Sequence, residues 1–150
     1  MSIVSQYKTE QNLEVEGRWF AFPQLDGSIV ELLIARAGGS NSAYKREMRR
    51  LLRKHSRKGS LDIPIDQYPP AQRDVIDMMA TTILKGARTT LADGEVKEAI
   101  IDENGDWHQF NEACARMLLE IPDLQSEIRF KAADYKNFQG EADLGEIEGN

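Results

Sequence analysis

The stretch from residue 29 to residue 58 constrains the fold most, because an apolar strand, a glycine-containing corner and a basic helix follow one another there without a linker. The strand is expected over Ile29–Ile34, where β-branched side chains suit a pleated surface. In the corner, Ala35–Asn41, two adjacent glycines can take positive φ at no steric cost. Ser40 or Asn41 can then cap the helix that follows.

That helix is expected to run from about Ser42 to Lys58, with one apolar stripe and a basic remainder. The stripe repeats every 3.6 residues and comprises Tyr44, Met48, Leu51, Leu52 and His55. Eight of the nineteen lysines and arginines of the chain cover its other faces: Lys45, Arg46, Arg49, Arg50, Arg53, Lys54, Arg57 and Lys58. Because the net charge is −6 and the last third is acidic, the charge is uneven. This asymmetry predicts contacts between copies of the chain or with a charged partner.

Length and composition indicate a soluble globular protein with one core. The chain has 150 residues, of which 41 % are hydrophobic and 29 % are charged. It contains no apolar run long enough to span a membrane and no signal peptide at its start, so we expect it in the cytoplasm. Its one cysteine, Cys114, cannot form an internal disulfide and is predicted to be a small buried hydrophobe.

The N-terminal third predicts a hairpin. Residues 1–16 are polar with scattered apolar positions, and we expect a loosely held arm. An aromatic-rich strand is expected over Arg18–Phe22, and the Asp-Gly step within Pro23–Ser28 is a strong turn signal that leads into Ile29. Because an isolated hairpin is marginally stable in water, this one must pack on helices.

The remaining two-thirds predict helices and one further hairpin. Three prolines make 59–70 a loop, and a second long helix is expected over Ala71–Lys85, with Gly86 at its end. Two turn dipeptides predict a small hairpin near residues 96–110.

Two shorter helices and a tail complete the expected order. The first helix is expected over Glu112–Glu120 with Asn111 as its cap, and Pro122 is expected to open the second. Acidic residues and glycines predict a disordered tail over 139–150. The expected fold class is therefore α+β and mainly helical: a single domain over 1–138, in which the N-terminal hairpin packs on about four helices.

The residue patterns give little support for catalysis, metal binding or a cofactor. His55 lies among arginines, and His108 has no second histidine or cysteine nearby, so both are expected to be structural. The acidic residues around Gly105 lack the spacing of a calcium-binding EF-hand loop. Gly38-Gly39-Ser40 precedes a helix but lacks the Gly-Lys-Thr/Ser of a phosphate-binding loop. We therefore expect no enzyme.

The basic helix has three interpretations. The arginines at 46, 49, 50 and 53 could contact nucleic-acid phosphates, or pair bidentately with carboxylates of a protein partner. A long charged face can also simply be solvated. A helix that reads bases should carry Asn, Gln or Ser among its arginines, and this one does not. Nucleic acid is therefore the least favoured of the three.

Several short motifs follow one another in a fixed order along the chain. The first are Glu16-Gly17-Arg18-Trp19 and the segment from Leu33 to Gly38, which is followed by Asn41 and Tyr44. The order continues with Asp102 to Gly105, Phe110-Asn111-Glu112, Leu118-Leu119, Pro122-Asp123-Leu124 and Asn137-Phe138. These motifs span most of residues 13–138, and in this order they resemble the tail assembly chaperones of long-tailed, siphovirus-like phages and prophages. The first motif is similar to the family's entry into its first strand, and the second resembles the family's Ile-Ala-Arg-x-Gly-Asn corner.

The resemblance implies a non-enzymatic protein of the bacterial host cytoplasm that is absent from the mature virion. Members of this family bind the aggregation-prone tape measure protein and help the tail tube protein to polymerise around it. Homo-oligomers, and a longer frameshifted form of the same chain, would be further partners. No cofactor and no membrane are implied.

From the resemblance follows a hypothesis for the partner-binding residues. Arg46, Arg49, Arg50 and Arg53 would supply the charged rim of a groove for the tape measure protein, while the aromatic hairpin with Trp19 and Phe22 would support that groove or self-association. Two alternatives remain open. One is a small nucleic-acid-binding phage regulator that uses the basic helix 42–58, and the other is a tail completion or minor structural protein.

Overall fold

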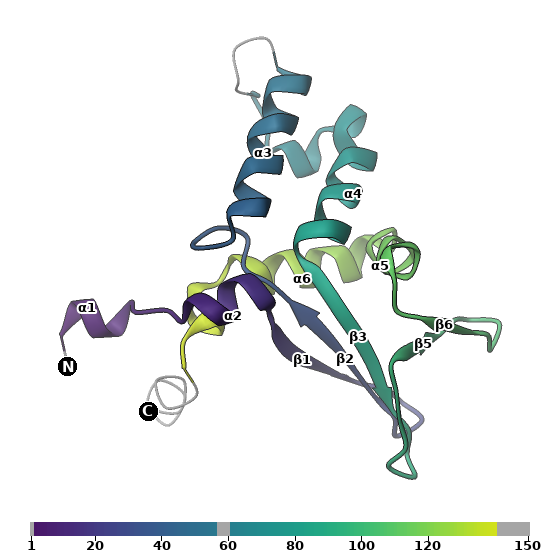
Figure 1. The fold of residues 1–150 in the computed structure, drawn as a ribbon. Helices are drawn as coiled ribbons and strands as arrows, with labels where there is room; N and C mark the ends of the chain where they lie inside the picture. The colour runs from purple at the N-terminus through teal and green to yellow at the C-terminus, as the bar shows by residue number, and fades with distance from the viewer. Residues whose placement is uncertain (1, 57–60, 141–150) are drawn as a thin grey trace.

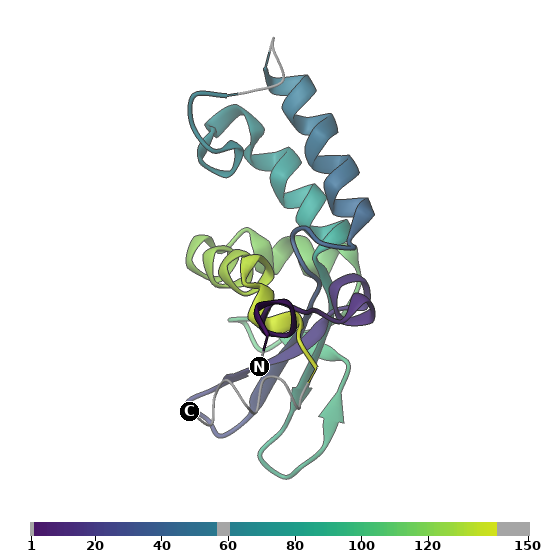
Figure 2. The ribbon, with the colours of Figure 1, turned by 90° about the vertical axis from the view of Figure 1, so that its left-hand side faces the viewer.

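The computed structural model describes residues 2–56 and 61–140, and it shows a mixed α+β protein, as the sequence predicts. A four-stranded antiparallel sheet forms the base, α3 and α4 project together from one end of it, and α5 and α6 lie on one side of it (Figures 1 and 2). The α-helices are α1 (Ile3–Gln6), α2 (Gln11–Glu16), α3 (Ser42–His55), α4 (Gln72–Thr82), α5 (Glu112–Leu119) and α6 (Pro122–Ala133). Three 3₁₀ turns are η1 (Ile65–Gln67), η2 (Pro69–Ala71) and η3 (Tyr135–Phe138).

The predicted N-terminal hairpin is confirmed, but it is part of a larger sheet. The main sheet has the order β1–β2–β3–β4, and a second sheet pairs β5 with β6. The strands are β1 (Arg18–Pro23), β2 (Ile29–Ile34), β3 (Leu84–Thr90), β4 (Val96–Lys97), β5 (Ala99–Ile101) and β6 (Trp107–Gln109). The β5–β6 hairpin confirms the small hairpin expected near 96–110, and Gly105 has the positive φ of 85° that its tight turn requires.

The end predicted for the second long helix was wrong. Helix α4 ends at Thr82 rather than Lys85, and the next residues form β3, which pairs with β2 over its whole length. A short apolar run such as Ile83-Leu84 fits a buried strand as well as a helix, so periodicity alone could not separate the two. Gly86 lies inside the strand, where a Cβ would come within 3.2 Å of the Trp19 ring. Its role is to allow close packing in a sheet rather than to end a helix.

The junction between β2 and α3 is organised by Asn41, which is 2 % exposed. Its side-chain oxygen accepts a hydrogen bond from the Tyr44 amide, so Asn41 is the helix cap and Ser40 is not. Its Nδ2 donates at 2.9 Å to the carbonyl oxygens of Arg36 and Thr82. Helix α3 ends at His55, three residues before the predicted end, because Ser56 is extended; residues 57 and 58 lie outside the described residues.

The expected loose arm is held firmly at α2. The Glu14 side chain is buried and pairs with Arg36, whose backbone amide also donates to the Glu14 carbonyl at 3.0 Å. Further along, the amide of Glu10 donates at 2.7 Å to the carbonyl of Phe138. The arm is therefore bound to both the glycine corner and the C-terminal 3₁₀ turn.

The final helix and the tail also differ in detail from the prediction. Pro122 opens α6 as expected, but the helix ends at Ala133 and the apolar stripe continues through η3, where Phe138 is fully buried. The sequence places Gln139 in the expected disordered tail, yet it is fully buried and its Nε2 donates to the carbonyls of Gln6 and Lys8. Residues 141–150 of the expected tail lie outside the described residues.

Replacement of Glu14 by alanine is expected to lower the free energy of unfolding by about 2–3 kcal/mol, because the partly buried Arg36 loses its partner. The measurement is urea unfolding followed by circular dichroism. Glu16→Ala on the same helix is the matched control: Glu16 is exposed, so its loss should change stability by less than about 0.5 kcal/mol. Equal stability of the two variants would contradict an anchoring role for Glu14.

Candidate functional site

The outer face of α3 carries a dense cluster of exposed positive charge. Arg46, Arg49, Arg50 and Arg53 are all exposed, as the sequence hypothesis requires. Arg50 is paired with Glu47 at 2.9 Å. Across residues 2–56 and 61–140, no carboxylate lies within ion-pair distance of Arg46, Arg49 or Arg53. We call these four arginines the arginine face.

The end of α3 is fixed to α4 by two bonds to one carboxylate. Lys54 Nζ and His55 Nε2 each lie 2.8 Å from Asp74 Oδ2, and the His55 ring meets Tyr68 edge-on. The hydrogen bonds from Lys54 and His55 hold the pKa of Asp74 below its usual value. His55 therefore joins two helices, which is a structural role.

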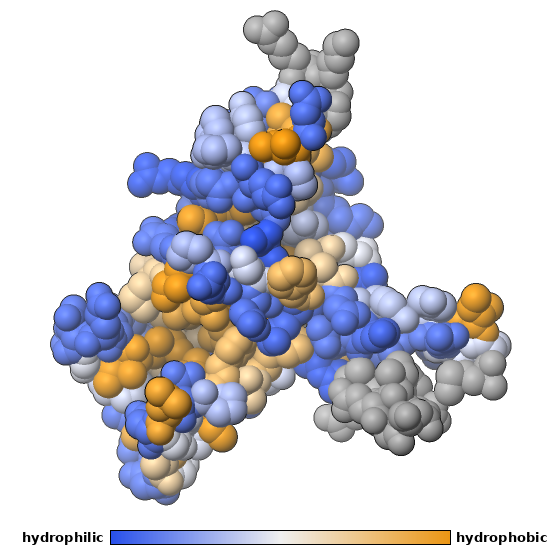
Figure 3. All heavy atoms as spheres, turned by 180° about the vertical axis from the view of Figure 1, so that it is seen from behind, coloured by the Kyte–Doolittle hydropathy of each residue, from blue (hydrophilic) through white to orange (hydrophobic). Residues whose placement is uncertain are grey.

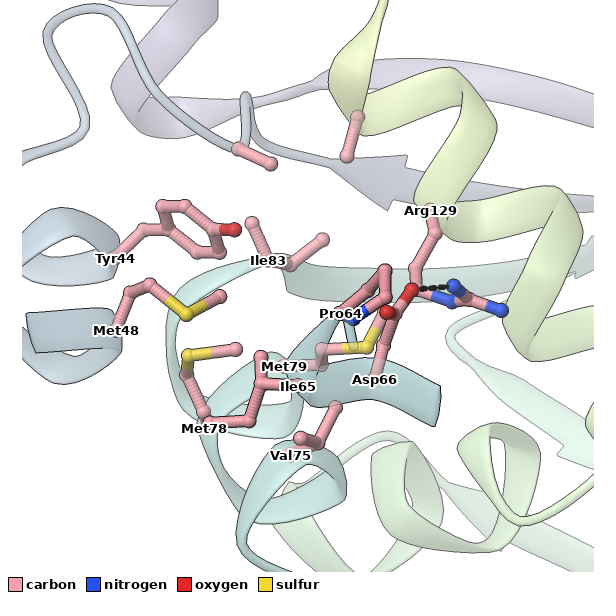
Figure 4. A pocket seen from close by; sticks show the side chains of 12 residues that line it. Tyr44, Met48, Pro64, Ile65, Asp66, Val75, Met78, Met79, Ile83 and Arg129 are labelled. Carbon is pink, nitrogen blue, oxygen red and sulfur yellow. Dashed lines mark hydrogen bonds and ion pairs between the residues drawn. The ribbon is translucent and has the colours of Figure 1, made fainter. Parts of the chain in front are cut away.

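The inner side of α3 borders an apolar pocket of about 260 Å³ (Figure 4). Its lining comes from α3, η1, α4 and α6 and from the segments beside them. The side chains include Tyr44, Met48, Pro64, Ile65, Asp66, Val75, Met78, Met79, Ile83 and Arg129. We call it the methionine pocket, because three flexible thioether side chains lie together in it (Figure 4).

The methionine pocket is suited to binding rather than to proton transfer. Its two charged groups, Asp66 and Arg129, already pair with each other at its side (Figure 4). Burial, and to a smaller extent the charge of Asp66, raises the pKa of Tyr44, so the phenol stays protonated at neutral pH. Methionine side chains adapt to irregular apolar shapes. An apolar side chain of a partner is therefore the kind of ligand that this pocket fits.

Trp19 and Phe22 lie in the sheet and not beside the arginine face; that the aromatic hairpin supports the groove or self-association stays a prediction. Their strand alternates in burial, which places them on opposite faces of the sheet. The Arg88 guanidinium stacks over Trp19 at 3.9 Å, whereas Phe22 faces α6, with Lys131 Nζ 5.5 Å from its ring. The β1–β2 turn also lies at the end of the sheet away from α3 (Figure 1).

Phe22 instead borders an apolar surface that sequence reasoning missed. On the side seen in Figure 3, apolar side chains gather between the β5–β6 hairpin and the β1–β2 turn. Two adjoining hollows of about 360 and 400 Å³ lie there, and they share Ile100, Ile101 and Leu118 as lining residues. One signal in the sequence points to this surface. Ile121 directly precedes Pro122 at the corner between two helices, where capping does not require an apolar side chain.

The other chemically notable residues also have structural roles. His108 Nε2 lies 2.6 Å from Asp102 Oδ2, a contact that braces the β5–β6 turn. Cys114 is buried, as predicted, and burial raises the pKa of its thiol. Within the described part of the chain, no three histidine, cysteine or acidic side chains gather as they would around a metal ion.

Comparison of the chain with protein-family models, with curated proteins and with solved structures finds no match. In residues 2–56 and 61–140, no helix has both the length and the apolar character needed to cross a membrane. The case for function therefore depends on the surfaces described above and on the sequence motifs.

Replacement of Asp74 by asparagine is expected to lower the free energy of unfolding by about 1 kcal/mol at pH 7. The pKa of Asp74 is lower in the folded state than in the unfolded state, so its contribution is present above the unfolded value of 3.8 and is lost as the pH falls through the folded value. The difference between wild type and variant should thus shrink below pH 4. The measurement is urea unfolding at pH 7 and below pH 4. Asp62→Asn, at an exposed position, is the control. A difference that stays constant with pH would contradict this assignment.

Proposed function

We propose that the protein is a tail assembly chaperone of a long-tailed phage, which binds the tape measure protein through the arginine face of α3. One observation carries the proposal: three arginines on one exposed helix face have no acidic partner within the described residues. Guanidinium groups bind carboxylates bidentately, and such pairs give geometric specificity to protein contacts. An acidic stretch of a helical partner would supply carboxylates that pair with these three guanidinium groups.

The location of the resemblance motifs supports this proposal. Asn41 and Tyr44 belong to the corner motif; Asn41 ties the corner to the end of α4, and Tyr44 lines the methionine pocket. The motif thus positions α3 with its arginines outward and its apolar residues inward. In such a mechanism the protein acts by stoichiometric binding, and the pocket takes apolar side chains of the same long helical partner.

The remaining parts of the proposal come from the resemblance. Action in the bacterial host cytoplasm, help for the tail tube protein to polymerise, self-association and a longer frameshifted partner form belong to the same chaperone role. None of them requires a cofactor or an active site.

Arg46→Glu combined with Arg49→Glu is expected to reduce co-purification with a co-expressed tape measure protein at least tenfold, because both side chains would repel an acidic partner. The matched control is Lys85→Glu with Lys136→Glu, which changes the net charge equally at exposed positions outside α3. Circular dichroism of both pairs checks the fold. Binding that survives the α3 reversal would contradict the role of the arginine face.

The nucleic-acid alternative gives a different result in an electrophoretic shift assay. A DNA- or RNA-binding regulator would bind its target with an affinity that falls steeply between 50 and 200 mM salt and is lost in the α3 variant. For a chaperone we expect no such complex at physiological salt. A second alternative, a tail completion or minor structural protein, would be detected by mass spectrometry of purified virions, where a chaperone is absent.

A further inference from the structure

The two adjoining hollows beside α5 form one groove with an apolar floor and exposed apolar walls. Leu118 and Ile100 are buried at 7 % and 6 % exposure, and both line each of the two hollows. Ile101 and Ile121 remain 46 % and 49 % exposed, and each lines the hollow next to the β5–β6 turn. Exposed isoleucines around a depression indicate a surface that another molecule covers.

Backbone geometry keeps this groove open. Thr89 Oγ1 donates at 2.7 Å to the carbonyl of Ala99, which fixes the start of the β5–β6 hairpin to β3. The rest of that hairpin extends away from the body (Figure 1), and Pro122 begins α6 shortly after α5 ends. The walls are therefore held apart by strands and helices, and the groove does not depend on a mobile loop.

The charged residues that line the groove are all acidic. They are Asp26, Asp102 and Glu103, and among the residues that the structure describes the lining contains no lysine, arginine or histidine. Hydrogen bonds from Ser28 lower the pKa of Asp26, and those from His108 and the turn amides lower that of Asp102, so both are ionised at neutral pH. Two bases adjoin these lining residues: His108 Nε2 lies 2.6 Å from Asp102 Oδ2, and Lys131 faces Phe22 and lies 3.6 Å from Glu127.

We propose that this acidic groove is a second docking surface, and that it binds an amphipathic helical segment of a partner protein, with an apolar face bordered by lysine or arginine. The apolar side chains would fill the two hollows above Leu118, and the basic side chains would reach the carboxylates at either end. The groove and the arginine face then select segments of opposite charge. This inference does not depend on the chaperone assignment.

The two occupants that the chain itself could supply fit less well. Its own segment 141–150 carries Glu141, Asp143, Glu146 and Glu148 with no base, so it would repel the acidic rim. Helix α3 of a second copy offers arginines, but its apolar stripe already packs in its own core, where Leu51 is fully buried. A partner segment that combines both properties is the better match.

The test uses the full protein with methyl-labelled isoleucine and leucine, and two synthetic 14-residue helical peptides. One peptide combines leucine with lysine, and the other has glutamate in place of every lysine. The lysine peptide should shift the methyl resonances of Ile101, Leu118 and Ile121 and bind at least tenfold more tightly than the glutamate peptide at this groove. Equal affinity, or shifts that leave these three methyl groups unmoved, would overturn the proposal.

Variants then separate the groove from general charge attraction. Ile121→Lys and Glu103→Lys should each weaken binding of the lysine peptide at least tenfold. Val96→Lys is the matched control, because Val96 is 58 % exposed but lies outside both hollows. Unchanged binding in Ile121→Lys, or an equal loss in Val96→Lys, would overturn the proposal.

Sedimentation analysis tests whether a second copy is the occupant. A dimer that Ile121→Lys dissociates would also overturn the proposal, because the groove would then bind a second copy of the chain. The Arg46 and Arg49 reversal leaves the groove intact, so failure of the chaperone proposal gives a distinct result.

Discussion

The arrangement of the whole molecule depends on the buried amide of Asn41. This one side chain caps α3 and donates hydrogen bonds to two carbonyl oxygens, that of Arg36 in the glycine corner and that of Thr82, the last residue of α4. A buried polar group with all three of these bonds made is stable, whereas the loss of any partner would leave a costly unsatisfied group. Asn41 thus sets the angle at which the α3–α4 pair leaves the sheet.

That angle separates two surfaces of opposite charge. The arginine face projects with α3 from one end of the sheet, and the acidic groove lies near the β1–β2 turn at the other (Figures 1 and 3). The net charge of −6 conceals this division, because it averages a basic helix with an acidic groove and tail. Electrostatic attraction between exposed charges is screened beyond about a Debye length at physiological salt, so a charged segment at one surface is little affected by the other.

Local signals in the sequence predicted the local features of this fold. Asp26-Gly27 predicted the β1–β2 hairpin, and Asn111 and Pro122 predicted where α5 and α6 begin. Strand β3 could not be predicted, because its residues around Gly86 are neither alternating nor β-branched, and their strand form depends on pairing with β2. Helical periodicity was enough to place the arginines outside. The methionine pocket and the acidic groove combine residues far apart in sequence, which only tertiary packing brings together.

The fully buried Gln139 holds the first and last described segments of the chain together. Because its side chain bonds to the carbonyls of Gln6 and Lys8, the first and last described segments are spatial neighbours although more than 130 positions separate them. A short peptide linker could join them covalently, and new ends could be opened in the exposed β1–β2 turn near Leu25. The chain could therefore be joined at one place and reopened at another while the contacts that Gln139 makes are kept.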